Sequence, residues 1–158
     1  MSRVYNLQFS QFIPATIKQT WQFFSAPENL PKITPPEMNF KILSRPSQKV
    51  YAGQIIEYNV SVLPGIALYW MTEITNVVEE VYFVDEQRFG PYSLWHHQHH
   101  FKPEKDGVMM TDIIHYKIPF WILGDLANTL FVKKQLIKIF QHRTQMVNEL
   151  FTPSHTNL

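Results

Sequence analysis

Residues 108–151 read VMMTDIIHYKIPFWILGDLANTLFVKKQLIKIFQHRTQMVNELF, and the spacing of their apolar side chains changes at Pro119. Before Pro119 the pattern has a period of two, which is typical of a half-buried strand. After it the apolar residues recur at the 3.6-residue period of a helix, which predicts one long helix over about 122–151. At 1.5 Å per residue this helix is about 40 Å long, enough to cross a whole sheet. Its apolar stripe consists of Leu123, Leu126, Leu130, Ile137, Phe140, Val147 and Phe151, and the opposite side carries Asn128, Gln135, Lys138, His142, Gln145 and Glu149.

Short runs rich in β-branched and aromatic residues fill the region before this helix. Six of them are recognisable, over residues 40–44, 52–62, 67–78, 81–89, 92–102 and 108–118. Turn signals separate them at Ser44–Gln48, Pro64–Gly65, Gly90–Pro91 and Lys105–Gly107. Connections this short predict an antiparallel meander with one buried and one wetted face.

The N-terminal region predicts one more strand and two short helices. Tyr5, Leu7, Phe9 and Ile13 alternate with polar residues, as in a half-buried strand. Pro14 fits the first turn of a helix in which Ile17, Trp21 and Phe24 share one side. Pro27 opens a second short turn that carries Leu30, and the run Ile-Thr-Pro-Pro at 33–36 stops any helix.

The expected architecture is therefore α+β, a curved seven-stranded antiparallel sheet wrapped round a long C-terminal helix, with two short helices after the first strand. Such a sheet and helix enclose a volume that only large side chains could fill completely. Where they do not fill it, we expect an apolar cavity that binds a ligand.

Composition limits the function classes. The 158 residues suit one domain, here placed at 1–152 with a short tail at 153–158. With 14 basic and 13 acidic residues the net charge is +1, so no nucleic-acid partner is expected. The absence of cysteine excludes disulfides, thiolate zinc sites and a cysteine nucleophile. No signal peptide is expected, because the N-terminal residues 1–12 alternate apolar with polar side chains and lack a continuous apolar run. No membrane span is expected either, since the most apolar later stretch, 118–132, contains Asp125 and is too short, and the expected compartment is the cytoplasm.

Several short motifs resemble a known family. They are Ile33-Thr-Pro-Pro36, Phe83-Val-Asp-Glu-Gln87, Gly90-Pro-Tyr92, Trp95-x-His97-x-His99-x-Phe101 and Asp112-x-x-x-Tyr116-x-x-Pro119. In this order they resemble the bacterial branch of the START-related, pollen-allergen-like (SRPBCC) ligand-binding superfamily. The resemblance implies a helix-grip fold. It leaves the activity open, because the superfamily includes lipid carriers, hormone receptors, polyketide cyclases and dehydratases.

A polar patch is expected on one face of three adjacent strands. Within residues 92–101, alternate side chains share a face, and a tight turn at Gly90–Tyr92 would set Asp85 beside His97 and Gln87 beside Trp95. His96, Gln98 and His100 would lie on the other face. The expected ligand-binding residues are Asp85, Gln87, Trp95, His97, His99, Asp112 and Tyr116.

This patch has two competing interpretations. It either contacts the polar head group of a ligand, or it is a structural His–Asp network that satisfies its own hydrogen bonds. General acid–base catalysis is a third and less favoured possibility. Same-face histidines with a carboxylate also suit zinc, but no established zinc motif is present and the resembled family is mostly metal-free, so neither a metal nor another cofactor is expected.

The leading functional hypothesis is a binding module for a hydrophobic, lipid-like or polyketide-like small molecule. The rivals are a cyclase, dehydratase or hydrolase with His97 or His99 as base, oriented by Asp85 or Asp112, and a regulatory domain with a vestigial cavity. The C-terminal helix also carries Lys133, Lys134, Lys138 and Arg143. A solvated face explains these four better than a membrane surface or a partner.

Overall fold

The computed structural model describes residues 3–44, 49–63, 66–119 and 131–152. Over these ranges the elements follow the expected order. The strands are β1 (Tyr5–Ile13), β2 (Lys41–Ile42), β3 (Gln54–Leu63), β4 (Ile66–Val78), β5 (Tyr82–Phe89), β6 (Leu94–Glu104) and β7 (Gly107–Lys117). The helices are α1 (Ile17–Phe24), the 3-10 helices η1 (Pro27–Ile33) and η2 (Pro36–Met38), and α3 (Lys133–Phe151). The expected helical residues Leu123, Leu126, Asn128 and Leu130, and the tail at 153–158, lie outside the described residues.

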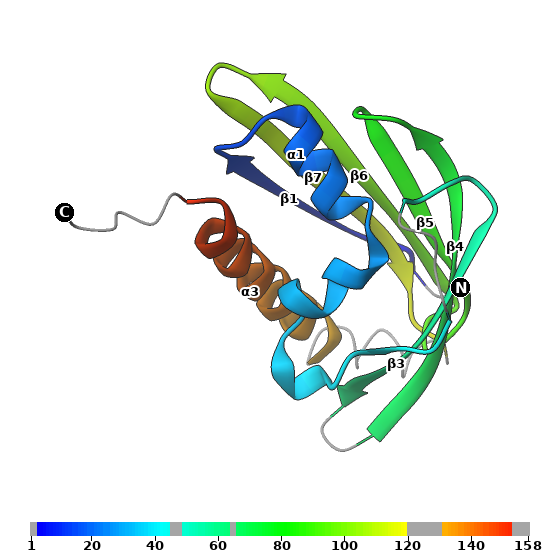
Figure 1. Cartoon of the computed structure of the whole chain (residues 1–158). Coiled ribbons are helices and arrows are strands. Elements are labelled where there is room, and N and C mark those ends of the chain that lie inside the picture. Colours follow the sequence, from blue (N-terminus) through cyan, green and yellow to red (C-terminus); the bar gives the residue numbers. More distant parts are fainter. Residues whose placement is uncertain (1–2, 45–48, 64–65, 120–130, 153–158) are drawn as a thin grey trace.

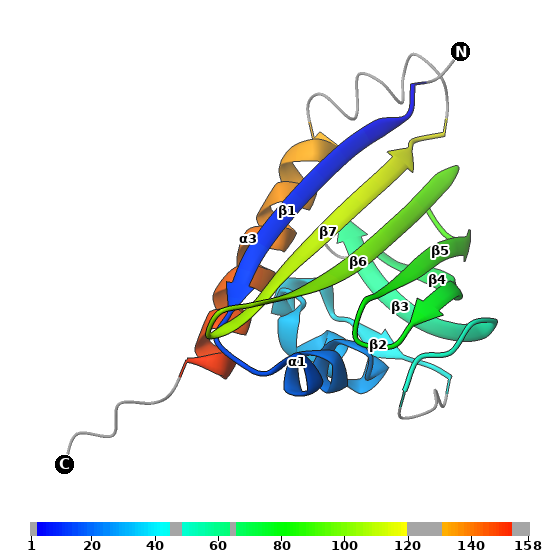
Figure 2. The same cartoon turned by 90° about the horizontal axis from the view of Figure 1, so that it is seen from above.

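The strands form one seven-stranded antiparallel sheet in the order β1-β7-β6-β5-β4-β3-β2. From β2 to β7 the spatial order follows the chain, and β1 forms the other edge by pairing with β7. Figures 1 and 2 show the sheet curving so that α3 and α1 lie on the same side of it. The α+β fold with a sheet wrapped round a C-terminal helix is confirmed.

Strict alternation along β6 and β7 sends one set of side chains toward the helices. In β7 the buried positions are Val108, Met110, Asp112, Ile114 and Tyr116, and the residues between them are half-buried. In β6 the buried positions are Trp95, His97, His99 and Phe101. The predicted common face of Trp95, His97, His99, Phe101, Asp112 and Tyr116 is therefore the buried face of β6 and β7.

The concave face carries two apolar clusters. One gathers around Trp21, Phe83 and Phe101, and the other around Trp95 and Phe140. Along β6, the two buried histidines stand between Trp95 of one cluster and Phe101 of the other. A polar group therefore interrupts an otherwise apolar interior.

The structure corrects two details of the N-terminal region. Pro14 does not lie in the first turn of α1, because Thr16 is the N-cap and forms a capping box with Gln19. The Thr16 hydroxyl accepts a hydrogen bond from the backbone N–H of Gln19, which would otherwise have no partner in the first turn of the helix. The prolines at 33–36 end η1 at Ile33 as expected, but Pro36 then opens the single turn η2, since its fixed φ suits a first helical position.

The side of helix α3 that packs against the sheet differs slightly from the apolar side predicted from the sequence. Phe140 and Val147 are buried as expected, whereas Ile137 is only half-buried and its neighbour Leu136 is buried instead. The predicted end of the helix at residue 151 is confirmed, while its predicted first residues lie outside the described part of the chain. Among the described residues no helix is long and apolar enough to cross a membrane.

Candidate functional site

A cavity of about 190 Å³ lies on the concave side of the sheet. Strands β3 to β6 form one wall, and η1 and α3 contribute to the others. Most of its lining is apolar, including Phe24, Ile33, Val60, Trp70 and Phe140. The charged or titratable side chains that line it are Asp85, His97, His99, Arg143, Tyr58 and Tyr92.

Strand register brings the predicted acid and imidazole groups together. Asp85 of β5 lies opposite His97 of β6, and Asp112 of β7 lies opposite His99. Trp95 lies opposite Tyr116. Cross-strand partners on one face have Cβ atoms about 4.5–5.5 Å apart, so short side chains such as aspartate reach the imidazoles directly.

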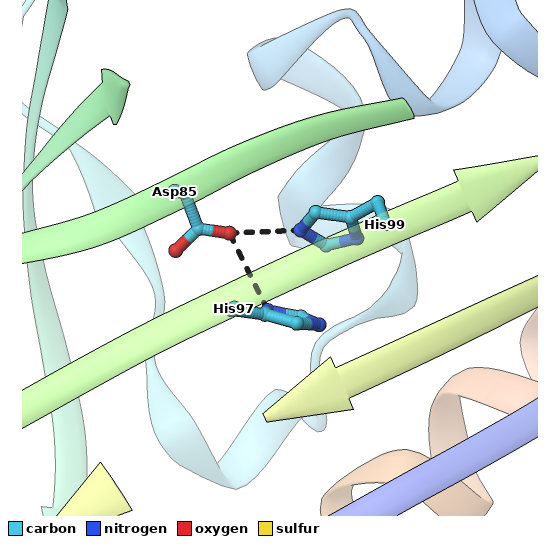
Figure 3. A group of neighbouring side chains, drawn as sticks. All are labelled: Asp85, His97 and His99. Carbon is cyan, nitrogen blue, oxygen red and sulfur yellow. Dashed lines mark hydrogen bonds and ion pairs between the residues drawn. The ribbon is translucent and has the colours of Figure 1, made fainter. Parts of the chain in front are cut away.

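The four side chains close into a ring of two histidines and two aspartates. Asp85 Oδ2 lies 2.8 Å from His99 Nε2 and 3.4 Å from His97 Nδ1 (Figure 3). On the other side, His97 Nε2 donates a hydrogen bond of 2.9 Å to Asp112 Oδ1, and His99 Nδ1 lies 2.8 Å from the same oxygen. The two imidazole centroids are 3.8 Å apart. Each carboxylate therefore bridges both rings.

Arg143 of α3 completes this group and was interpreted incorrectly from the sequence. Its side chain is only 12% exposed, and its Nη2 lies 3.5 Å from Asp112 Oδ1. The guanidinium also lies over the rings of Phe24 and Phe140, at 5.2 and 5.5 Å from their centroids. Arg143 therefore belongs to the interior and not to a solvated basic face. Its apolar methylene groups and flat guanidinium pack against the two phenylalanine rings, while the guanidinium charge faces the Asp112 carboxylate.

Mutual charge sets the protonation of the ring. Burial raises the pKa of Asp112, but Arg143 and the two histidines outweigh it and hold that pKa well below its ordinary value. Burial also raises the pKa of Asp85, and the histidines again bring it below its ordinary value. Two imidazoles this close do not both become positively charged easily, because like charges repel. Burial and the charge of His99 lower the pKa of His97, whereas the two carboxylates overcome burial and raise the pKa of His99.

The remaining predicted site residues have separate positions. Trp95 lines the cavity, with its ring 5.4 Å from and nearly perpendicular to Trp70. Tyr116 is buried beside Tyr5 and Tyr92 and is not among the lining residues. Gln87 also lies off the cavity lining, where its amide joins both backbone groups of Tyr92. Asp112 stands behind the histidines, away from the lining.

A second polar group of the wall was missed from the sequence. Thr72 Oγ1 accepts a hydrogen bond of 3.1 Å from Trp70 Nε1 and lies 2.9 Å from the hydroxyl of Tyr58. Burial and the negative charge of Asp85 raise the pKa of Tyr58, which keeps its hydroxyl protonated. The β-branched and aromatic residues of β3 and β4 predicted strands. Nothing in the local sequence indicated that the hydroxyls of Tyr58 and Thr72 would pair with each other across these strands.

The alternate residues of β6 lie on the convex face, as predicted. Gln98 bridges His96 and His100 through its amide, and His96 contacts Glu86. This half-exposed network lies on the opposite side of the sheet from the cavity. Because His96 and His100 belong to the same strand as the buried His97 and His99, they offer a matched control for substitutions at that pair.

Comparisons with known proteins bear on the fold. No protein-family model and no curated protein matches the sequence. Among solved structures, a protein from Chromobacterium violaceum matches with a TM-score of 0.70 at 15% identity, over 94% of this chain and 98% of that one. The major latex-like protein 151 of Panax ginseng matches with a TM-score of 0.69 at 15% identity, over 95% and 99%. A protein from Thermus thermophilus matches with a TM-score of 0.68 at 16% identity, over 96% and 100%.

The fold is pollen-allergen-like. These matches cover nearly the whole of both chains, which supports the fold that the sequence motifs imply. At identities of 15–16% they show the fold alone, since unrelated functions share such a scaffold.

Proposed function

We propose that this protein binds a compact hydrophobic small molecule in the cavity between the sheet and α3, with a polar group of the ligand directed at Asp85, His97, His99 and Arg143. The observation that carries the proposal is the cavity itself, a largely apolar volume with charged groups gathered in one region. Small-molecule sites have this composition, because apolar walls supply affinity and a few polar groups fix orientation.

The size of the cavity restricts the ligand. A volume of about 190 Å³ falls below the roughly 300 Å³ at which small-molecule pockets usually begin. An apolar cavity of about 150 Å³ can still hold benzene. The proposed ligand is therefore a one- or two-ring compound or a short lipid-like chain, and a larger polyketide would have to widen the cavity.

Enzymatic action by His97 or His99 has less support. Each of the four imidazole nitrogens lies within 3.4 Å of a carboxylate oxygen. A general base needs a ring nitrogen that can reach a substrate proton. Three of these nitrogens lie 2.8–2.9 Å from a carboxylate oxygen, and the fourth, His97 Nδ1, still faces Asp85 at 3.4 Å. A substrate would therefore have to displace Asp85 from the imidazoles, so binding is the better-supported function.

The proposal is tested by filling the cavity. Val60 is buried on β3 and lines the cavity, so Val60→Phe places a larger side chain in the ligand volume. Val78→Phe is the matched control, because Val78 is 43% exposed at the end of β4 and does not line the cavity. Calorimetric titration with naphthol, a two-ring compound of the proposed size, measures the affinity of each protein.

We expect wild-type protein and Val78→Phe to bind alike, and Val60→Phe to bind at least tenfold more weakly while keeping its circular dichroism spectrum. Equal affinity of all three proteins, or no binding by any of them, would contradict the proposal. Native mass spectrometry of protein purified from its own host is a second test, since a co-purifying small molecule lost from Val60→Phe would identify the ligand.

A further inference from the structure

We propose that Asp85, His97 and His99 form a binding site for a divalent transition-metal ion such as Zn²⁺, supported from behind by Asp112. This goes beyond the proposed small-molecule binding and departs from the expectation that no metal binds. Each of the three side chains offers one donor atom, these atoms all lie within 4.8 Å of one another, and both imidazoles contact the Asp85 carboxylate (Figure 3).

Two of the three distances between the donor atoms, those from Asp85 to each imidazole, are close to the distances in a metal site. Zinc bonds to imidazole nitrogen and carboxylate oxygen measure about 2.0–2.1 Å, so tetrahedral ligand atoms lie about 3.3 Å apart. His97 Nδ1 and Asp85 Oδ2 are 3.4 Å apart, which is longer than an ordinary N–H···O hydrogen bond. His99 Nε2 is 2.8 Å from the same oxygen. Binding would require this second pair to open by about half an ångström, a shift within the reach of one carboxylate rotation.

Asp112 provides the outer support that metal-binding histidines usually have. Ligating imidazoles commonly donate their second N–H to a carboxylate, which fixes the tautomer and the ring orientation. His97 Nε2 already donates to Asp112 Oδ1. His99 Nδ1 lies 2.8 Å from the same oxygen, yet it is a buried nitrogen without an aligned hydrogen bond. Coordination through His99 Nε2 would place the ring proton on Nδ1, facing Asp112.

The charges of the surrounding side chains favour metal binding on the Asp85 side of the His–Asp ring over the Asp112 side. Arg143 approaches Asp112, so that carboxylate already has a permanent cation. Among the described residues, the ion pairs of Asp85 are with the two histidines only. Asp85 also lines the cavity, whereas Asp112 does not. A metal on the Asp85 side therefore meets a carboxylate without a permanent cation and is accessible from the cavity.

The donor set defines the class of metal. Two imidazoles and one carboxylate suit zinc and neighbouring transition metals, while Ca²⁺ and Mg²⁺ prefer six or more oxygen ligands. Three protein ligands leave at least one coordination position for water or a ligand atom. All three proposed ligand residues line the cavity. No zinc motif was recognisable because the ligands come from β5 and β6 and are brought together by register, not by spacing along one helix.

The test uses untagged, chelator-treated protein titrated with Zn²⁺ and with Co²⁺ alone. We expect one equivalent of either ion to bind, and the Co²⁺ adduct to show the strong visible absorption of a four- or five-coordinate site. His97→Gln and His99→Gln should each abolish stoichiometric binding. Asp112→Asn should retain one equivalent but weaken it by about 10–100-fold, as loss of an outer-shell partner does.

The double variant His96→Gln/His100→Gln is the matched control, because it removes two histidines of the same strand from the convex face. It should bind the metal like wild-type protein. Binding that survives His97→Gln and His99→Gln, or that disappears in the control, would overturn the proposal. So would weak, octahedral Co²⁺ absorption in the wild-type protein, a readout that needs no variant to fold. None of these measurements involves an organic ligand, so the two proposals fail separately.

Discussion

Arg143 and Asp112 lie 3.5 Å apart in the interior, the one on α3 and the other on β7. Their side chains are only 12% and 9% exposed, so the pair joins the long helix to the middle of the sheet through a charge contact within an apolar environment.

Arg143→Met tests the contribution of this pair. Methionine keeps much of the apolar stem but leaves the Asp112 carboxylate without its permanent cation. Removing one partner of a buried pair costs about 3–5 kcal/mol, and we expect a loss of this size in the free energy of unfolding measured in urea. Lys138→Met is the control on the same helix, since Lys138 is 75% exposed in its pair with Glu37 and its loss should change stability little. Equal effects of the two substitutions would contradict the buried role of Arg143.

Phe140→Ala tests the apolar stripe of α3. Phe140 is 5% exposed and stacks on Phe9 with ring centroids 4.4 Å apart. Its truncation should cost about 3–5 kcal/mol in chemical denaturation, because the surrounding side chains can only partly fill the space. Phe131→Ala is the comparison, since Phe131 is 67% exposed and should tolerate the change. Phe140 also lines the cavity, so a milder loss with tighter probe binding would mean that the residue mainly shapes the ligand volume. The sequence predicts a cost of about 2–5 kcal/mol for the same change at Leu130, but that residue lies outside the described part of the chain.

Thr72→Val tests the second polar group of the cavity wall. The substitution leaves the indole N–H of Trp70 and the hydroxyl of Tyr58 without their common partner. Each buried polar group left unpaired costs about 1–3 kcal/mol, so the free energy of unfolding should fall by at least this amount. Thr111→Val removes a hydroxyl that pairs with Ser10 on the exposed side of the sheet and should have a much smaller effect. Thermal and urea unfolding of both variants measure the difference, and a reversed order would contradict it.

Gln87→Leu tests the turn that positions Tyr92. The Gln87 amide donates to the carbonyl of Tyr92 at 2.6 Å and accepts from its N–H at 3.2 Å. Tyr92 in turn packs on Trp70 and Trp95 in the cavity wall. We expect a loss of about 1–3 kcal/mol in urea denaturation together with weaker naphthol binding. Gln145→Leu, at an exposed helix position, is the control. Unchanged naphthol affinity with reduced stability would restrict Gln87 to a purely structural role.

The sequence determined the order of the strands and helices and the common face of Trp95, His97, His99, Asp112 and Tyr116. The change of period at Pro119 predicted a helix ending at residue 151, and the short turn after Gly90 predicted that Asp85 lies beside His97. These predictions succeeded because side-chain alternation and turn length act locally and set the register of neighbouring strands. The same reasoning placed His99 and Asp112 on one face of adjacent strands.

Only the tertiary structure decided which groups meet across the interior. Arg143 shares a helix side with Leu136, Phe140 and Val147, but an arginine at such a position can either extend into solvent or fold inward. Its direction depends on Asp112 of β7 and Phe24 of α1, which are distant in sequence, as well as on Phe140 of its own helix. The volume of the cavity likewise depends on how closely the side chains of η1, α3 and the sheet interdigitate, and the distances within the His–Asp ring depend on how the curved strands bring their side chains together. Packing of this kind joins residues far apart in sequence, so no local pattern specifies it.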